Sequence, residues 1–156
     1  MIVPDHLDLP GADIDCYDVA CLLITQDGRY LMQLRDDLPH LPLRNHWGLF
    51  GGQVEEGETL QQAMIRELQE ELEFTPASLT RFTETTFKFL GRKRHHKTFF
   101  IAPILESDIA AMRQHEGAGK RLFRVTELLQ EPLFVPWDVL GVILHARQDA
   151  MIRHAF

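Results

Sequence analysis

Three glutamates with helical spacing are the residues of this chain best suited to carry chemistry. Glu67, Glu70 and Glu71 project within an arc of roughly 100° if residues 59–73 form a helix. Like charges at this spacing weaken a helix by roughly 0.2–0.5 kcal/mol per pair, and Arg66 is the only basic residue in the segment. Mg²⁺ and Mn²⁺ prefer carboxylate oxygens, so a divalent cation would turn this repulsion into binding. A solvated, glutamate-rich face is the alternative.

Glycines in front of this helix favour the metal site. Gly51 and Gly52 follow a short predicted strand, and Gly57 lies just before the helix. Glycine permits positive φ and close backbone approach, so the segment can fold back over the start of the helix. Its peptide groups can then reach a metal ion or the phosphates that accompany it.

The stretch 51–74 resembles the signature of the Nudix family, the MutT-like hydrolases. That pattern reads Gly, five residues, Glu, seven residues, Arg-Glu, an apolar residue, any residue, Glu-Glu, any residue, Gly and an apolar residue. The matching residues here are Gly52, Glu58, Arg66, Glu67, Leu68, Glu70, Glu71 and Phe74. The one departure is Glu73, which stands where the family places glycine.

The resemblance implies a metal site built on the matching glutamates. Glu67, Glu70 and Glu71 would bind Mg²⁺, for which Mn²⁺ is a substitute. A backbone carbonyl of Gly52, or of Gly51 beside it, would be a further ligand.

The resemblance also implies residues that support this metal site. Glu58 would be an outer glutamate and Arg66 its orienting ion-pair partner. Family members often need another carboxylate from a later loop, as general base or extra ligand. We expect Glu116 to supply it, with Glu106 and Asp108 as weaker candidates and a solvated loop glutamate as the alternative.

Four residues are candidates for binding the substrate. Arg35 resembles a substrate-facing arginine of related enzymes, with a surface arginine as the alternative. Phe50 either lines the pocket or belongs to the core. Trp137 and Asp138 offer an aromatic face and a carboxylate that can accept from exocyclic amines, although an aspartate at a helix start is also favoured by the helix dipole. A basic turn at 92–97 could hold a phosphate or contact RNA; a solvated hairpin tip is the alternative.

The reaction implied by the resemblance is hydrolysis of a phosphoanhydride bond in a nucleoside diphosphate derivative, such as a nucleoside triphosphate or a nucleotide sugar. Water adds to phosphorus while a charged phosphate group leaves, and bound metal neutralises the oxygens and places the water. Residues 88–92 lack the marks of subfamilies specialised for ADP-ribose, dinucleoside polyphosphates or NADH. A Nudix-fold isomerase of a prenyl diphosphate and a non-catalytic nucleotide-binding module are the alternatives.

Composition predicts one globular domain over 1–156, with an irregular arm at 1–15. The net charge is −7, and residues 55–73 alone hold seven acidic residues and one basic residue. The remaining chain is therefore nearly neutral, and the acidity is local to the site. An acidic chain excludes duplex nucleic acid and anionic membranes as partners, because both need a basic face. The expected partner is a phosphorylated small molecule that arrives with a metal ion. The sequence is compatible with a homodimer as well as with a monomer.

The N-terminal residues and the two cysteines favour a cytoplasmic protein. No stretch approaches the run of about 20 apolar residues that a membrane helix needs. The first residues carry no positive charge and no apolar stretch of the kind found in signal peptides. Cys16 and Cys21 would point to opposite faces of one strand, so they cannot pair and should be buried thiols in a reducing compartment.

The elements that must position these residues suggest an α/β class, a Nudix-type α/β/α sandwich with a mixed sheet between helices. Thr59 and Gln62 have the form of a capping box at the start of the main helix. A non-glycine residue at position 73, just past the helix end, costs about 1–2 kcal/mol in αL geometry, so we expect lost stability there rather than lost chemistry. The pattern predicts strands at 16–24, 29–34, 47–50, 81–90, 97–105 and 121–125, helices at 59–73, 107–114 and 136–153, a helical turn at 126–130, a loop at 36–46 and a turn at 91–96.

Overall fold

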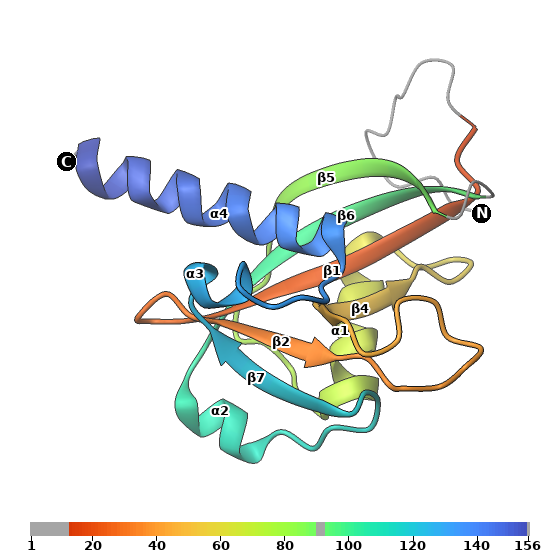
Figure 1. Ribbon diagram of the computed structural model, residues 1–156. Coiled ribbons are helices and arrows are strands. Elements are labelled where there is room, and N and C mark those ends of the chain that lie inside the picture. Colours follow the sequence, from red (N-terminus) through yellow and green to blue (C-terminus); the bar gives the residue numbers. More distant parts are fainter. Residues whose placement is uncertain (1–12, 90–92, 156) are drawn as a thin grey trace.

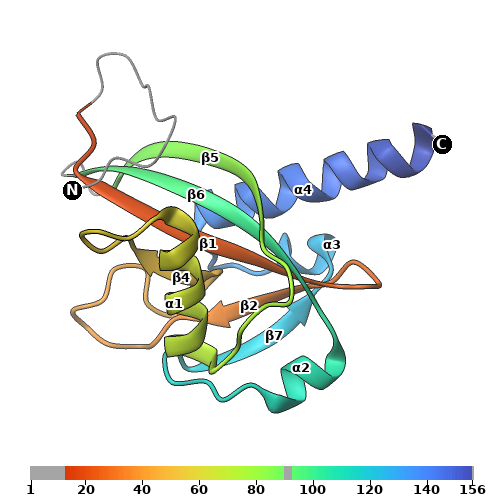
Figure 2. The same cartoon turned by 180° about the vertical axis from the view of Figure 1, so that it is seen from behind.

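The computed structural model describes residues 13–89 and 93–155. Within them, seven strands form one mixed sheet, with α1 on one face and α3 and α4 on the other, as Figures 1 and 2 show from opposite sides. This confirms the predicted sandwich of helices around a mixed sheet. The strands are β1 (Cys16–Thr25), β2 (Tyr30–Leu34), β3 (Trp47–Gly48), β4 (Phe50–Gln53), β5 (Thr80–Phe89), β6 (Lys93–Ile104) and β7 (Gly119–Phe123), and the helices are α1 (Leu60–Leu72), α2 (Glu106–Ala111), α3 (Val125–Leu128) and α4 (Pro136–Ala155).

β1 is the centre of the sheet and is buried on both faces. It pairs in parallel with β6 and antiparallel with β2 and β4. Because side chains alternate along a strand, Val19 and Cys21 pack in the core layer beneath α1, while Ala20 and Leu22 pack in the layer beneath α4. The two faces of one apolar strand therefore hold the two helical layers together. Cys16 and Cys21 are free and buried.

α1 forms as its sequence predicts. The Thr59 hydroxyl accepts from the Gln62 N–H, and the Gln62 side chain accepts from the Thr59 N–H, which satisfies two N–H groups at the helix start. The apolar stripe that packs on β1 and β4 is fully or nearly fully buried; it consists of Leu60, Ala63, Met64, Leu68 and Leu72. The helix ends at Glu73, which adopts the left-handed conformation with φ 50° and ψ 40°.

β6 begins at Lys93, and this corrects the predicted basic turn at 92–97. His95 lies opposite Phe87 of β5 and opposite Cys16 of β1, so this segment is paired on both sides. Two flanking strands supply backbone partners for residues whose sequence reads only as polar and basic. Lys93 to Lys97 are therefore strand residues, and Arg92 lies outside the described residues.

Two further predictions need adjustment. The strand predicted at 47–50 is two short strands, and Gly51 and Gly52 belong to the second, where they pair with Ala20 and Val19. The predicted arm at 1–15 lies mostly outside the described residues, and 13–15 belong to no helix or strand.

Two connections bring together segments that are distant in the sequence. Segment 133–135 pairs with Trp47, whose N–H donates to the Leu133 carbonyl and whose carbonyl accepts from the Val135 N–H, and this sets the start of α4 beside β3. The loop before β7 caps α1: the N–H groups of Arg113 and His115 donate to the carbonyls of Leu72 and Glu71. No helix in the described parts of the chain is long and apolar enough to cross a membrane.

We predict that Glu73→Gly stabilises the protein. The change removes the cost of a side chain in the left-handed region, about 1–2 kcal/mol, and loses the 2.7 Å contact between Glu73 Oε2 and His115 Nε2. That pair is solvent-exposed and contributes about 0–1 kcal/mol, so urea denaturation should give a net gain of about 0.5–1 kcal/mol. Glu73→Ala keeps the backbone strain and is the control, expected to gain nothing. A large loss of hydrolytic activity in Glu73→Gly would contradict a purely structural role.

Candidate active site

Arg66 and Glu58 form a clamp that ties α1 to the segment in front of it. Arg66 Nε lies 2.6 Å from Glu58 Oε1, and its Nη2 lies 3.0 Å from Glu58 Oε2, a two-pronged ion pair. The same Nη2 donates to the Gln53 carbonyl at 2.9 Å. Hydrogen bonding to Arg66 lowers the pKa of Glu58. The clamp fixes the end of β4 against the helix that carries the other glutamates.

Glu71 and Glu67 are carboxylates held in a costly environment. Glu71 is 3% exposed, and burial first, then the charges of Glu116 and Glu67, raises its pKa to about 9. Burial likewise raises the pKa of Glu67, even though Arg66 Nη1 lies 2.8 Å from its Oε1. Glu70 is the exposed member of the set, with its Oε2 3.2 Å from Arg66 Nη1. One arginine thus faces several carboxylates and cannot neutralise them all.

Gly51 and Gly52 let the backbone of β4 reach these carboxylates. The Gly51 N–H donates to Glu71 Oε2 at 3.1 Å. A Cβ atom at Gly52 would lie 2.6 Å from the Glu67 carboxylate, and one at Gly51 would collide with the backbone of Val19. A side chain at position 52 would displace Glu67, and one at position 51 would displace β1, so glycine at both positions lets β4 lie against the site.

Glu116 lies beside the glutamates of α1, while its two sequence competitors do not. Its charge raises the pKa values of Glu71 and Glu67, and it lines the same cavity as Glu71. Gln33 Nε2 donates to the Glu116 carbonyl at 2.9 Å and fixes this part of the loop. Glu106 instead contacts Arg29 at the surface, and Asp108 caps the start of α2.

The donor set fits a hard divalent cation by its chemistry. Carboxylate oxygens beside a glycine backbone are the ligands that Mg²⁺ takes in proteins. As placed, no three acidic, histidine or cysteine side chains among residues 13–89 and 93–155 are gathered closely enough to hold an ion. Arg66 accounts for this, because it draws the carboxylates of Glu67 and Glu70 toward itself.

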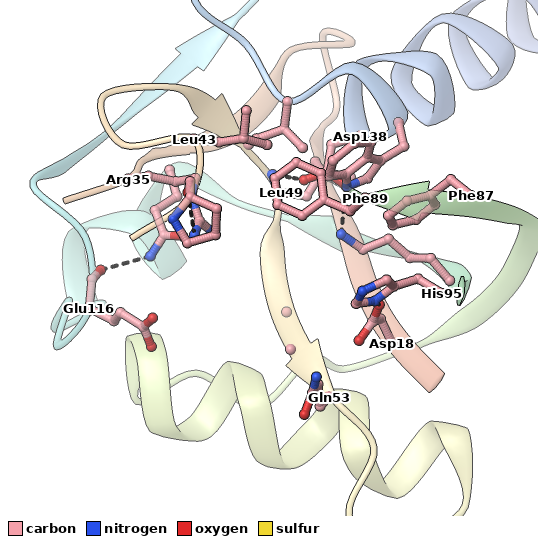
Figure 3. Close-up of a pocket in the computed structure, with 18 of the residues that line it drawn as sticks. Asp18, Arg35, Leu43, Leu49, Gln53, Phe87, Phe89, His95, Glu116 and Asp138 are labelled. Atoms are coloured by element: carbon pink, nitrogen blue, oxygen red, sulfur yellow. Dashed lines mark hydrogen bonds and ion pairs between the residues drawn. The ribbon is translucent and has the colours of Figure 1, made fainter. Parts of the chain in front are cut away.

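A cavity of about 280 Å³ opens from the glutamates across the α4-facing side of the sheet. Figure 3 shows Glu116 and Arg35 on one side of it and Asp18, His95 and Phe87 on the other. Glu71, Gly51 and Gly52 line the acidic end. The remaining lining residues are Gln33, Pro42, Leu43, Gly48, Leu49, Gln53, Phe89, Lys97, Val135, Trp137 and Asp138.

The predicted substrate residues divide between this cavity and the core. Arg35 lines the cavity, and its Nε and Nη2 donate to the Pro42 carbonyl at 3.3 and 3.1 Å, which holds the 36–46 loop over the opening. Phe50 is fully buried in the core beneath α1 and does not line the cavity. Of the two alternatives for Phe50, the structure therefore has the core position and not the substrate contact; alternation along β4 turns it inward, and the neighbouring Leu49 lines the cavity instead.

Trp137 and Asp138 both line the cavity, in different capacities. The Trp137 ring stacks on Phe87 with centroids 4.2 Å apart and planes inclined by 12°, and Phe89 meets its edge. Asp138 is 3% exposed; its Oδ2 accepts from the Leu49 N–H at 2.9 Å and its Oδ1 from Lys97 Nζ at 2.8 Å. Both carboxylate oxygens of Asp138 therefore already accept hydrogen bonds from the protein. The sequence suggested instead that this carboxylate would accept from exocyclic amines of the substrate.

The sequence interpretation did not single out Asp18, Gln33 or Gln53 of this cavity, and it named His95 and Lys97 only as part of a basic turn that could hold a phosphate or contact RNA. Asp18 lies in the apolar strand β1, and His95 and Lys97 lie in the segment interpreted as a turn. A lone carboxylate inside an apolar strand needs a hydrogen-bond or charge partner when it is buried. The position of Asp18 in the apolar run of β1 was therefore the sequence signal for a polar partner nearby. The partner is His95, whose Nδ1 lies 2.6 Å from Asp18 Oδ2.

We predict that Glu71→Gln removes a pH-dependent loss of stability in the metal-free protein. The pKa of Glu71 is about 9 in the folded state, against 4.5 as its ordinary value, so the folded protein retains a proton that the unfolded chain gives up. Stability is therefore fully present below pH 4.5 and is lost as pH rises toward 9. Urea denaturation in EDTA should show that the free energy of unfolding of the wild type falls between pH 5 and pH 8. This fall should exceed that of the variant by more than about 1 kcal/mol. Glu56→Gln, at an exposed site, is the control; identical pH profiles for wild type and Glu71→Gln would refute the assignment.

Known proteins resemble this chain in sequence over part of its length and in fold over most of it. Nucleoside triphosphatase NudI from Escherichia coli O139:H28 (strain E24377A / ETEC) is 41% identical over 70 residues, which are 44% of this chain and 48% of that protein. The match thus spans about half the length of the curated relatives.

Two solved structures share the fold. The MutT protein of Methanosarcina mazei Go1 superimposes with a TM-score of 0.73 at 18% identity, over 86% of this chain and 94% of that one. The NUDIX domain of Shewanella oneidensis NrtR, solved in complex with ADP ribose, gives 0.65 at 22% identity, over 93% and 94%. At these identities the likeness concerns the fold.

The family assignment comes from the sequence itself. The NUDIX domain profile matches residues 16–139, from the start of β1 to the first turn of α4. That range holds the clamp, the glutamates of α1, the glycines of β4 and Glu116. The chain therefore belongs to the Nudix family.

Proposed function

We propose that this protein is a Mg²⁺-dependent pyrophosphohydrolase of a nucleoside diphosphate derivative, with a nucleoside triphosphate as the first candidate substrate. The carrying observation is that the buried Glu71, whose pKa is raised by the charges of Glu116 and Glu67 as well as by burial, lies at one end of a cavity whose far wall is aromatic and polar. A nucleotide has the matching polarity, with charged phosphates at one end and a planar base at the other. The similarity to a nucleoside triphosphatase over 70 residues supports the choice.

The glutamates of α1 would bind the metal. Glu67, Glu70 and Glu71 are the ligands, and the Gly52 or Gly51 carbonyl is the backbone ligand. The Arg66–Glu58 clamp keeps their backbone in place when the carboxylates turn from arginine to cation. Bound Mg²⁺ would neutralise phosphate oxygens and lower the pKa of a coordinated water.

Glu116 would be the general base. It comes from a loop whose N–H groups cap α1, so its position follows that of the helix. A carboxylate in this place can accept the proton from the attacking water while the distal phosphate group leaves with the bridging oxygen. The products are a nucleoside monophosphate, or another phosphate ester, and the remaining phosphate fragment.

The aromatic end would hold the base of the nucleotide. Trp137 is fixed on one face by Phe87 and also lines the cavity, so it offers a rigid platform for stacking. Arg35 stands across the cavity, where its charge can attract phosphate. The partner is thus a phosphorylated small molecule, and the free, buried cysteines agree with a cytoplasmic location.

The second candidate is a nucleotide-binding module without catalysis. The fold it shares with a NUDIX domain solved with ADP ribose favours this alternative, while the intact charged positions of the signature favour catalysis. The same intact positions weigh against a prenyl diphosphate isomerase. An assay of phosphate or pyrophosphate release distinguishes the hydrolase from the module and the isomerase. It uses a panel of nucleoside triphosphates, nucleotide sugars, ADP-ribose and capped RNA, with Mg²⁺ or Mn²⁺. Tight metal-dependent binding of one compound without release would identify a module.

We predict that Glu70→Gln abolishes release while leaving the protein folded. Glu70 is exposed, so the amide leaves the core unchanged but removes one charged ligand. Loss of a metal ligand should lower kcat by more than about 100-fold, since even outer partners of a metal cost 10–100-fold. Glu56→Gln is the matched exposed control and should retain full activity. A Glu70→Gln enzyme with normal turnover would overturn the metal assignment.

We also predict that Glu116→Gln lowers kcat and leaves metal affinity nearly intact. A missing general base typically costs about 100- to 10,000-fold in rate. The measurement is turnover at saturating Mg²⁺ across pH, beside calorimetric Mg²⁺ binding. Near-normal turnover would remove Glu116 from the catalytic residues, and a large loss of metal affinity would make it a ligand instead.

A further inference from the structure

Two polar pairs line the β6 wall of the cavity. His95 and Lys97 lie two residues apart in β6, so both side chains emerge on the α4-facing side of the sheet. Each is paired with a carboxylate from a neighbouring element, His95 with Asp18 of β1 and Lys97 with Asp138 of α4. All four side chains are less than 20% exposed, so these are built features of the wall.

The first pair holds a hydrogen-bond acceptor toward the cavity. Asp18 Oδ2 lies 2.6 Å from His95 Nδ1, and a carboxylate can only accept, so Nδ1 carries the hydrogen. In the neutral ring, Nε2 then has a lone pair, and it has no partner among the described residues. Phe87 stacks on the ring with centroids 5.2 Å apart and planes inclined by 3°, which fixes its direction. Figure 3 shows the His95 ring beside Asp18 at the cavity.

The second pair holds a donor at the same wall. Lys97 Nζ donates to Asp138 Oδ1 at 2.8 Å, and Asp138 is itself fixed by the Leu49 N–H. An ammonium group has three N–H bonds, and within the described residues Lys97 uses one. The Lys97 side chain lines the cavity and is 14% exposed, so its remaining N–H groups can donate to a ligand in the cavity.

We propose that Lys97 and the His95–Asp18 pair read the base of the nucleotide and select bases with a lactam edge, in which a carbonyl oxygen adjoins a ring N–H. Lys97 donates to the carbonyl, and His95 Nε2 accepts from the N–H. Uracil, thymine, guanine and hypoxanthine carry this edge. Cytosine and adenine present an amine and a bare ring nitrogen, which reverses both hydrogen bonds.

This assignment rests on the proposed function and adds the substrate class. Trp137, His95 and Lys97 line the same cavity, and Phe87 contacts both Trp137 and His95, so a base bound in this cavity beside Trp137 shares it with the β6 wall. A base with the reversed edge would leave the Lys97 donor and the His95 acceptor unpaired in a mostly buried site. Sites of this kind reject the wrong partner strongly, because unmade buried hydrogen bonds are costly.

The test compares substrates that differ only in this edge. Inosine and adenosine triphosphates form one pair, and uridine and cytidine triphosphates form the other. Wild-type kcat/KM should favour the lactam member of each pair by at least about tenfold. His95→Phe keeps the stack on Phe87 and removes the acceptor, so both ratios should fall toward one. His95→Gln, which restores an acceptor, should recover part of the preference.

Two controls separate this inference from the function it builds on. His40→Phe, an exposed histidine outside the cavity, should leave the ratios unchanged. Lys97→Met with Asp138→Asn removes the charged pair together, so no lone carboxylate is buried, and it should lower the same ratios. Turnover without a lactam preference, or with one that His95→Phe leaves intact, would overturn the inference alone. If no compound of the nucleotide panel is hydrolysed, the proposed function fails. Calorimetric binding of inosine and adenosine monophosphates then decides the base preference: tenfold tighter inosine binding supports it, and equal binding refutes it.

Discussion

The crowding of carboxylates at one end of α1 is the constraint on which the rest of this structure depends. Burial raises the pKa values of Glu67 and Glu71, and the one arginine among them is divided between Glu58, Glu67 and Glu70. A fold selected for stability alone would not place acids there. The two glycines of β4 bring the strand against the acids, and the loop that carries Glu116 adds one more charge. This local architecture supports the proposal that the site binds a cation.

The sheet connects this acidic end to a region of different chemistry. β1 separates two packing layers, and the cavity runs from the edge near α1 onto the side covered by α4. There the wall is aromatic, with Phe87 and Trp137 stacked, and its polar groups are already paired with each other. A ligand with a metal-bound phosphate at one end and a planar group at the other would fit both ends of this cavity. A nucleotide that carries a divalent cation on its phosphates meets both conditions.

Local patterns were enough to predict most of the fold. The capping box at Thr59, the stripe from Leu60 to Leu72 and the apolar run of β1 each specify their element within a few residues. Spacing on one helix likewise predicted the glutamate cluster. What failed depends on pairing between distant strands: β6 begins at Lys93 because β1 and β5 flank it, and Phe50 faces the core because of the register of β4. The partners of Asp18 and Asp138 are 77 and 41 residues away, beyond any local pattern.

Metal binding coupled to proton release tests the central claim most directly. Glu71, with a pKa of about 9 without metal, is protonated at pH 7.5 and must lose its proton to become a ligand. Calorimetric titration with Mg²⁺ or Mn²⁺, in buffers that differ in ionisation enthalpy, counts the protons released. The account predicts saturable binding with release of about one proton by the wild type and less by Glu71→Gln. Absence of saturable binding, or binding that releases no proton from the wild type, would contradict it.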